Sequence, residues 1–232
     1  GYEVVWSQSI VQFMSTRTYA FAVVLATYLT GLFIGSSLMA RRVDRLHDPW
    51  GVFALLIAGA GLVALLEVAL LGRWLILLQT QAETAALALG GSVLLGMSAR
   101  FAVAALSIVF APTLLLGAAF PVALRLCVGP GRVGRDVGAV VAFNTLGGII
   151  GVALCGFVLI PWLGLVRTLG VLAIIAAAVC FIAVRQGHGV KKGHRQGVIA
   201  VSLAALLVAV LTPVERLADL LPGARNGELA FY

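Results

Sequence analysis

The sequence predicts an all-α fold, a polytopic bundle of about six or seven transmembrane helices. Hydrophobic residues make up 62% of the chain and charged residues 11%, whereas a soluble domain is near half apolar and a quarter charged. The apolar residues form runs that approach the length of about 20 helical residues needed to cross a hydrocarbon core. Basic residues occupy the gaps between these runs, where they fix membrane topology. These observations exclude an ordinary soluble domain and make the lipid bilayer the main solvent.

One transmembrane domain is expected over residues 1–212. Its apolar segments have the approximate ranges 1–14 (the partial end of a first helix), 18–40, 50–71, 101–124, 137–160, 166–184 and 198–212. The chain begins without an initiator Met or the n-region of a signal peptide, so we expect that the natural start has been removed.

The first complete spans, 18–40 and 50–71, have the ends and spacings of membrane helices. Gly31 and Gly35 form a small-x-x-x-small pattern in the first span, which lets another helix approach closely. Pro49 precedes the second span and suits the first turn of a helix, where its missing N–H would have no partner.

The stretch 72–99 is ambiguous because Gln79, Glu83 and several glycines interrupt its apolar residues. We interpret it as an interfacial or re-entrant connection, with an additional span as the alternative. The next span, 101–124, contains Pro112 and Pro121. Prolines kink membrane helices unless neighbours satisfy the freed carbonyls, and broken helices often line cavities.

The span 137–160 is the richest in glycine. Gly147, Gly148 and Gly151 are expected to pack closely against another helix, and Asn144 lies beside them. Residues 161–164 (Pro-Trp-Leu-Gly) should form a tight turn before the span 166–184.

The last span, 198–212, stops at a proline, and the residues after it are polar. Residues 213–232 therefore form a tail with turn residues and a short strand-like end, which is expected to lead into a soluble domain absent from this sequence.

Basic residues are concentrated in alternate loops, which we expect to be cytoplasmic. The rich loops hold Arg41, Arg42 and Arg45, then Arg125, Arg132 and Arg135, then Arg185, Lys191, Lys192 and Arg195, while the other loops hold Arg17, Arg73, Arg100 and Arg167. With this orientation the tail lies on the outer side unless the stretch 72–99 crosses the bilayer.

Several functional classes are not supported by the sequence. The net charge of +7 does not indicate nucleic-acid binding, because no aromatic residues interleave with the basic clusters. The three cysteines are scattered and the three histidines lie in basic loops, where a lone histidine is usually solvated, so no metal site is expected. No cofactor motif or catalytic constellation is present.

Three polar residues are candidates for a substrate or proton pathway. Glu67 lies in an apolar run, where a carboxylate costs about 2.5 to 3.5 kcal/mol on insertion scales. It is either a site for a proton or a cationic substrate, or a group near the outer end that reaches lipid headgroups or pairs with Arg73. Glu3 would complete an acidic lining, or it is an interfacial carboxylate. Asn144 is a pathway residue or the donor of an interhelical hydrogen bond.

Asp44, Arg45 and Arg41 lie where a helix meets the cytoplasm. An acid at this place can pair with a neighbouring helix end and latch one conformation. The alternative is a solvated turn.

Four segments resemble the membrane portion of the fused major facilitator/spermidine synthase-like proteins of bacteria. They are Tyr-Glu-Val-Val-Trp at 2–6, the run from Tyr-Ala-Phe at 19–21 through Leu-Thr-Gly-Leu-Phe-Ile-Gly-Ser at 29–36 to Asp-Arg at 44–45, Pro-Thr-Leu-Leu-Leu-Gly-Ala-Ala-Phe-Pro at 112–121, and Asn-Thr-Leu-Gly-Gly-Ile-Ile-Gly at 144–151. The resemblance implies a helical bundle similar to part of a major facilitator fold, in a multi-pass protein of the bacterial cytoplasmic (inner) membrane. It also implies that 229–232 approach the first strand of an aminopropyltransferase domain, whose cofactor loop and catalytic aspartate would follow Tyr232.

The expected function is therefore a membrane domain that anchors this absent domain and passes a small cationic solute. A freestanding transporter of the major facilitator type and a structural anchor or assembly subunit are the alternatives. About seven helices make little more than half of a twelve-helix transporter, so transport would require a homo-oligomer or a different fold. The expected partners are the lipid bilayer, the absent domain, and a second copy or another membrane subunit.

Overall fold

The computed structural model describes residues 17–70, 72–129, 131–187 and 190–213, with the side chains of residues 17–20 and 73 outside the description. Within these ranges every regular element is helical, which confirms the all-α fold. In chain order they are α2 (Arg17–Ala40), η1 (Val43–Arg45), α3 (Pro49–Leu70), α4 (Arg73–Ala88), α5 (Val93–Ala105), η2 (Leu106–Phe110), α6 (Ala111–Cys127), α7 (Val133–Leu154), η3 (Cys155–Leu159), α8 (Ile160–Gln186) and α9 (Lys192–Leu211). The expected partial helix 1–14, Glu3 and all but the first residue of the tail 213–232 lie outside the described residues.

Five helical runs in the described part are long and apolar enough to cross a membrane. They are Phe21–Ala40, Pro49–Leu70, Val93–Cys127, Val133–Gln186 and Lys192–Leu211. The fourth run has 54 residues and as one straight helix would be roughly 80 Å long, far more than the roughly 30 Å of a hydrocarbon core. The fold must therefore divide this run.

The division is at Gly164, whose φ of +74° lies in the left-handed region that favours glycine. The two ends of the run lie at the same end of the bundle. Near its start, Asp136 accepts a hydrogen bond from the Gly129 N–H just after α6, and after its end Gly187 lies against Trp50 at the start of α3. The chain thus reverses within the run, and the break falls in the predicted turn at residues 161–164.

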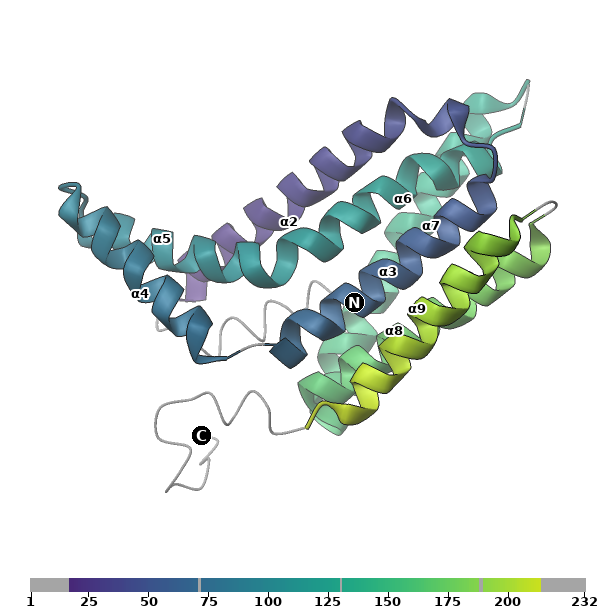
Figure 1. Cartoon of the computed structure of the whole chain (residues 1–232). Helices are drawn as coiled ribbons and strands as arrows, with labels where there is room; N and C mark the ends of the chain where they lie inside the picture. Colours follow the sequence, from purple (N-terminus) through teal and green to yellow (C-terminus); the bar gives the residue numbers. More distant parts are fainter. Residues whose placement is uncertain (1–16, 71, 130, 188–189, 214–232) are drawn as a thin grey trace.

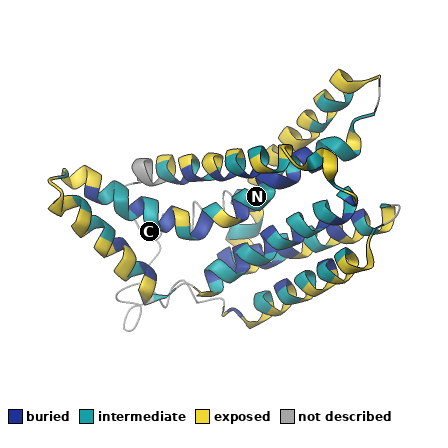
Figure 2. Ribbon diagram, turned by 45° about the horizontal axis from the view of Figure 1, so that its top comes forward, coloured by how far each residue is buried: buried dark blue, intermediate teal, exposed yellow. Residues whose placement is uncertain are grey.

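Helix α3 is central to the bundle and packs against α6, α8 and α9, while α2 packs against α6 (Figure 1). Figure 2 shows buried residues between the helices and exposed residues over their outer faces. Large apolar side chains on these faces are strongly exposed, including Phe33 at 71%, Phe157 at 82% and Trp162 at 83%. Such surfaces suit lipid contact and not water, so the helices fit a multi-pass membrane protein.

Each of two π-helical segments ends shortly before a proline. η2 precedes Pro112 and η3 precedes Pro161. A proline lacks the N–H that would close an α-helical turn, and a wider turn accommodates the loss without ending the helix. At the first site the Thr113 hydroxyl donates to the carbonyls of Val109 and Phe110, at 2.8 and 2.9 Å. The helix therefore continues through Pro112, and Pro121 lies buried inside α6.

The structure corrects the expected start of the span 101–124. The helical run begins at Val93, because Ser92 caps it by accepting a hydrogen bond from Leu95 N–H at 3.3 Å. Arg100 does not end the apolar segment, since it pairs with Glu83 of α4 at 3.5 Å. The ambiguous stretch 72–99 thus forms α4 and the first part of α5, which lie side by side and project from the bundle (Figure 1).

The predicted packing glycines fall into two groups. An added Cβ at Gly31 would collide with Thr113, and one at Gly35 with the Leu114 carbonyl, so α2 and α6 touch backbone to backbone. Within the described residues, by contrast, nothing lies within 4 Å of a Cβ added at Gly147 or Gly148 of α7. Helix α7 contains no fully buried residue, although Gly151 is half-buried.

The basic loops between helices gather at one end of the bundle, which we name the basic end (Figure 1). The loops are those between α2 and α3, between α6 and α7, and between α8 and α9. The Arg125 guanidinium links the first two by donating to the Val43 carbonyl. The Lys191 N–H links the third by donating to Asp48 at 3.0 Å.

Candidate functional site

Three features combine polar side chains with burial or with a cavity. They are a carboxylate junction at the basic end, an isolated carboxyl group in α3, and a cavity bounded by α2, α3, α6 and α7. The three features lie in different parts of the bundle and are described in turn.

The carboxylate junction is built by Asp48, which precedes the first residue of α3. Its Oδ1 accepts a hydrogen bond from the Gly51 N–H at 2.8 Å, the usual geometry of a helix N-cap. Its Oδ2 accepts from the Lys191 N–H at 3.0 Å and lies 2.7 Å from Nδ1 of His194. Lys191 is the N-cap residue of α9, and His194 lies in the first turn of that helix. One carboxylate therefore holds the N-terminal ends of α3 and α9 together.

The surroundings of Asp48 favour its charged form. Burial works against ionisation, because the residue is only 5% exposed. The hydrogen bonds from His194, Gly51 and Lys191 outweigh burial and hold the pKa of Asp48 below its ordinary value of 3.8. The positive ends of two helix dipoles act in the same direction. Gly51 is needed for this approach, because an added Cβ would lie 2.8 Å from Cβ of His194.

Glu67 lies one turn before the end of α3, toward the end of the bundle opposite the basic end. Its Oε2 is buried, and no described residue offers that oxygen a hydrogen-bonding partner. The neighbouring residues of its turn, Ala64, Leu65 and Val68, belong to the main apolar core. The alternative of a pair with Arg73 falls on a side chain outside the description. Within the described part of the chain, Oε2 of Glu67 is therefore a buried carboxyl oxygen without a partner in an apolar setting.

The cavity has a volume of about 810 Å³ and lies in the half of the bundle nearer the basic end. Its polar lining consists of the side chains of Tyr28, Ser36, Ser37 and Asn144. The remaining walls are Leu32, Phe33, Phe53, Ile57, Leu116, Gly117, Ala119, Phe120, Ala123 and Val140. A cavity of this size with few polar groups is typical of a small-molecule site.

The predicted pathway residues are not brought together. Asn144 lines the cavity, whereas Glu67 does not. Asn144 is exposed and makes no side-chain hydrogen bond to another described residue. The residues proposed as a conformational latch, Asp44, Arg45 and Arg41, are also exposed, and no ion pair joins them to another described side chain.

The junction of Asp48 with His194 was missed by sequence reasoning. His194 was expected to be a solvated loop residue, but it lies in α9, which begins at Lys192, and its ring contacts a buried carboxylate. Asp48 before Pro49 is a recognisable helix-start pattern. That pattern could have identified the cap of α3, but nothing local indicates a partner on α9.

No group of three or more His, Cys, Asp or Glu side chains in the described ranges could hold a metal ion. Comparison of the chain with family models, with curated proteins and with solved structures found no match. The function of this chain is therefore inferred from the four sequence segments and from the geometry of these three features.

Proposed function

We propose that this chain is the membrane-embedded domain of a spermidine synthase-like protein of the bacterial inner membrane. In this proposal it anchors an aminopropyltransferase-like domain that follows it and admits a small cationic solute to the bundle. The four sequence segments support the first part, because their order and spacing match the family and because they are spread from residue 2 to residue 151. The second part needs a group inside the bundle that attracts a cation.

The environment of Glu67 is the observation that supports admission of a cationic solute. A buried carboxyl oxygen without a protein partner is costly in an apolar region, and ionisable groups inside membrane bundles commonly mark solute or proton pathways. A cationic amine or a proton would supply the missing partner. Glu67 therefore has the role of a cation or proton acceptor.

The cavity supports the passage of a solute that carries apolar and cationic groups. Its lining combines the aromatic rings of Phe33, Phe53 and Phe120 with hydroxyl and amide oxygens. Aromatic faces attract ammonium groups and also contact methylene chains. Tyr28 and Asn144 add polar atoms to the same walls.

The distribution of charge favours entry of a cation from the end near Glu67. The basic end, which we assign to the cytoplasm from the charge pattern, repels cations at its surface. The opposite end has fewer basic residues in its loops. A cation arriving there would meet Glu67 before it reached the cavity.

A second candidate function is that of an assembly subunit, favoured by the surface of α7. This helix has no fully buried residue and leaves Gly147 and Gly148 without neighbours within 4 Å in the described structure. Small residues on an exposed membrane helix permit close approach by a second copy or another subunit. This function does not require solute movement.

Uptake of labelled spermidine into liposomes tests the solute proposal. We expect the purified chain to take up spermidine faster than empty liposomes, and Glu67→Gln to lower the initial rate roughly tenfold or more, as loss of a charged hydrogen-bonding partner would. Glu83→Gln is the matched control, because Glu83 pairs with Arg100 outside the core of the bundle. A wild-type rate equal to that of empty liposomes contradicts solute movement.

The proposed family has a separate test in the coding sequence. A reading frame that continues past Tyr232 into a glycine-rich cofactor-binding domain supports the anchoring role. A stop codon directly after Tyr232 contradicts it.

A further inference from the structure

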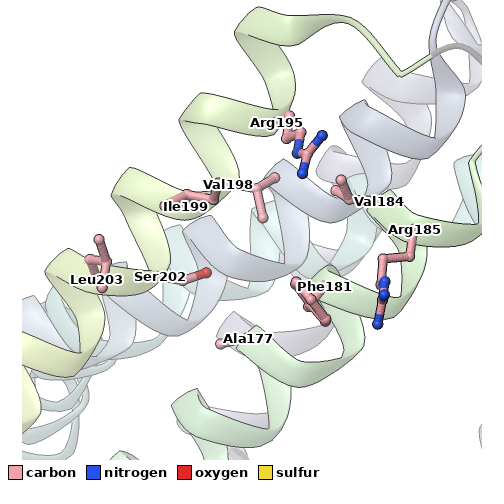
Figure 3. A pocket seen from close by; sticks show the side chains of 9 residues that line it. All are labelled: Ala177, Phe181, Val184, Arg185, Arg195, Val198, Ile199, Ser202 and Leu203. Carbon is pink, nitrogen blue, oxygen red and sulfur yellow. The ribbon is translucent and has the colours of Figure 1, made fainter.

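A groove between α8 and α9 opens at the basic end and carries two arginines at its mouth (Figure 3). Its cavity has a volume of about 570 Å³. Arg185 comes from the last turn of α8 and Arg195 from the first turn of α9. Figure 3 shows the Arg195 side chain extending toward α8, while Arg185 extends along its own helix toward Phe181. The guanidinium carbon of Arg185 lies 5.3 Å from the centre of that ring.

Neither arginine is neutralised by a described carboxylate. The ion pairs among the described residues are those of Arg100 with Glu83 and of His194 with Asp48. The sequence from 137 to 214, which includes both helices of the groove, contains no Asp or Glu. Asp48, which meets the first turn of α9, is already engaged by His194 and by the Lys191 N–H. No carboxylate among the described residues therefore offsets the two positive charges of the groove.

The groove continues from its basic mouth into the apolar part of the bundle. Its walls below the arginines are mainly aliphatic, and they share Ala177, Ser202 and Leu203 with a second cavity of about 200 Å³. That second cavity extends the groove past Gly170 and Leu206. From Arg195 to Leu206 is 11 residues, or roughly 16 Å along α9. One leaflet of the hydrocarbon core is about 15 Å thick.

We propose that this groove binds one anionic phospholipid from the leaflet at the basic end. The phosphate lies between Arg185 and Arg195, where guanidinium groups can donate paired hydrogen bonds to its oxygens. One acyl chain follows the shared wall of the two cavities. Basic pockets between membrane helices are suited to anionic headgroups, and the apolar continuation selects a lipid over a soluble phosphate.

Binding of lipid to the purified full chain tests this site. Native mass spectrometry from detergent micelles would measure affinity for dioleoyl phosphatidylglycerol and for dioleoyl phosphatidylcholine. We expect one phosphatidylglycerol to bind more tightly than phosphatidylcholine. The double variant Arg185→Gln/Arg195→Gln should bind phosphatidylglycerol roughly tenfold to thirtyfold more weakly.

Two further variants separate the site from general effects of charge and folding. Arg132→Gln/Arg135→Gln removes the same charge from the basic end outside the groove and should keep the wild-type affinity. Ser202→Trp would fill the apolar part and should weaken binding of lipid while both arginines remain. Circular dichroism should show wild-type helix content in each variant used.

Four results would overturn the proposal. The first is equal affinity for the two lipids, and the second is equal loss of affinity in the two double-arginine variants. The third is that glycerol 1-phosphate displaces the bound lipid and binds as tightly as the lipid does. This result would indicate a headgroup site without a bound acyl chain. Unchanged binding in a well-folded Ser202→Trp variant would contradict the acyl-chain path in the same way.

Discussion

Oδ2 of Asp48 lies 2.7 Å from Nδ1 of His194, and this contact between residues 146 apart in the sequence joins the N-terminal ends of α3 and α9. The same carboxylate caps α3 through the Gly51 N–H and reaches the Lys191 N–H at the start of α9. Loss of the carboxylate therefore removes a helix cap and a tertiary contact together.

Replacement of Asp48 should destabilise the bundle. We expect Asp48→Ala to lower the free energy of unfolding by about 2 kcal/mol, because a helix cap contributes about 1 kcal/mol and hydrogen bonds to a charged group contribute more. Chemical unfolding in detergent micelles, followed by circular dichroism, would measure the change. Asp44→Ala is the control, since Asp44 is exposed and should change stability by less than about 0.5 kcal/mol.

A double-mutant cycle isolates the part of this effect due to His194. Asp48→Ala and His194→Ala should be non-additive, because each removes the same 2.7 Å contact. Additive losses would show that the cap of α3 accounts for the whole effect and that the two helices are not coupled through these side chains.

The contribution of Asp48 to the stability of the fold should decrease as the pH falls. Its pKa in the folded protein lies below the ordinary value of 3.8, so the charged carboxylate stabilises the fold fully above about pH 4 and the contribution is lost as the pH falls through the folded pKa. The stability difference between wild type and Asp48→Asn, measured from about pH 6 to pH 2, should shrink at the acid end. A difference that stays constant or grows on acidification would contradict the role of the charge.

Gly31 and Gly147 were both expected to pack closely against another helix, but replacing each by alanine should change the free energy of unfolding in opposite directions. Gly31→Ala places a methyl group against Thr113 and the Phe110 carbonyl, so it should destabilise by roughly 1–3 kcal/mol through overpacking. Gly147→Ala meets nothing within 4 Å in the described structure and should stabilise the isolated chain by up to about 1 kcal/mol through helix propensity. Unfolding of both variants in micelles would measure the difference.

The response of Gly147 also bears on assembly. If a second subunit packs on α7, Gly147→Ala should weaken the oligomer while it stabilises the monomer. Analytical ultracentrifugation in detergent, alongside the unfolding experiment, separates the two effects. A destabilised monomer would contradict the open surroundings of this glycine.

Composition and charge spacing were sufficient to predict the helical class and the positions of most of the apolar runs. Lipid requires backbone hydrogen bonds to be satisfied within each crossing segment, so a long apolar run has few alternatives to a helix. The turn before Leu165 was also predictable, because Pro161 and Gly164 are both strong local signals. These features are determined by residues close together in the chain, so a single sequence is enough to predict them.

The missed features depend on partners distant in the sequence. The helix beginning at Val93 continues past Arg100 because Glu83, in another helix, pairs with that arginine. The candidate latch was placed at Asp44 because that residue lies where a helix meets the cytoplasm, whereas the buried carboxylate at the basic end is Asp48. Asn144 and Glu67 were grouped because both are polar residues in apolar runs, but the fold separates them. Periodicity and composition carry no information about such pairings.

The central claim is that the chain crosses the membrane repeatedly and that its basic loops all lie on one side. Cysteine labelling with a membrane-impermeant maleimide tests this claim most directly. Cys155 and Cys180 are buried and would be replaced by alanine, whereas the native Cys127 is exposed at the basic end. In a background that also lacks Cys127, single cysteines at Gln186 and Trp162 would report the basic end and the reversal between α7 and α8.

Labelling should be compared in inside-out and right-side-out vesicles. Cys127 and Gln186→Cys should react only in inside-out vesicles, and Trp162→Cys only in right-side-out vesicles. Reaction of Cys127 and Trp162→Cys from the same side would contradict the path of the chain on which the cavity, Glu67 and the lipid groove all depend.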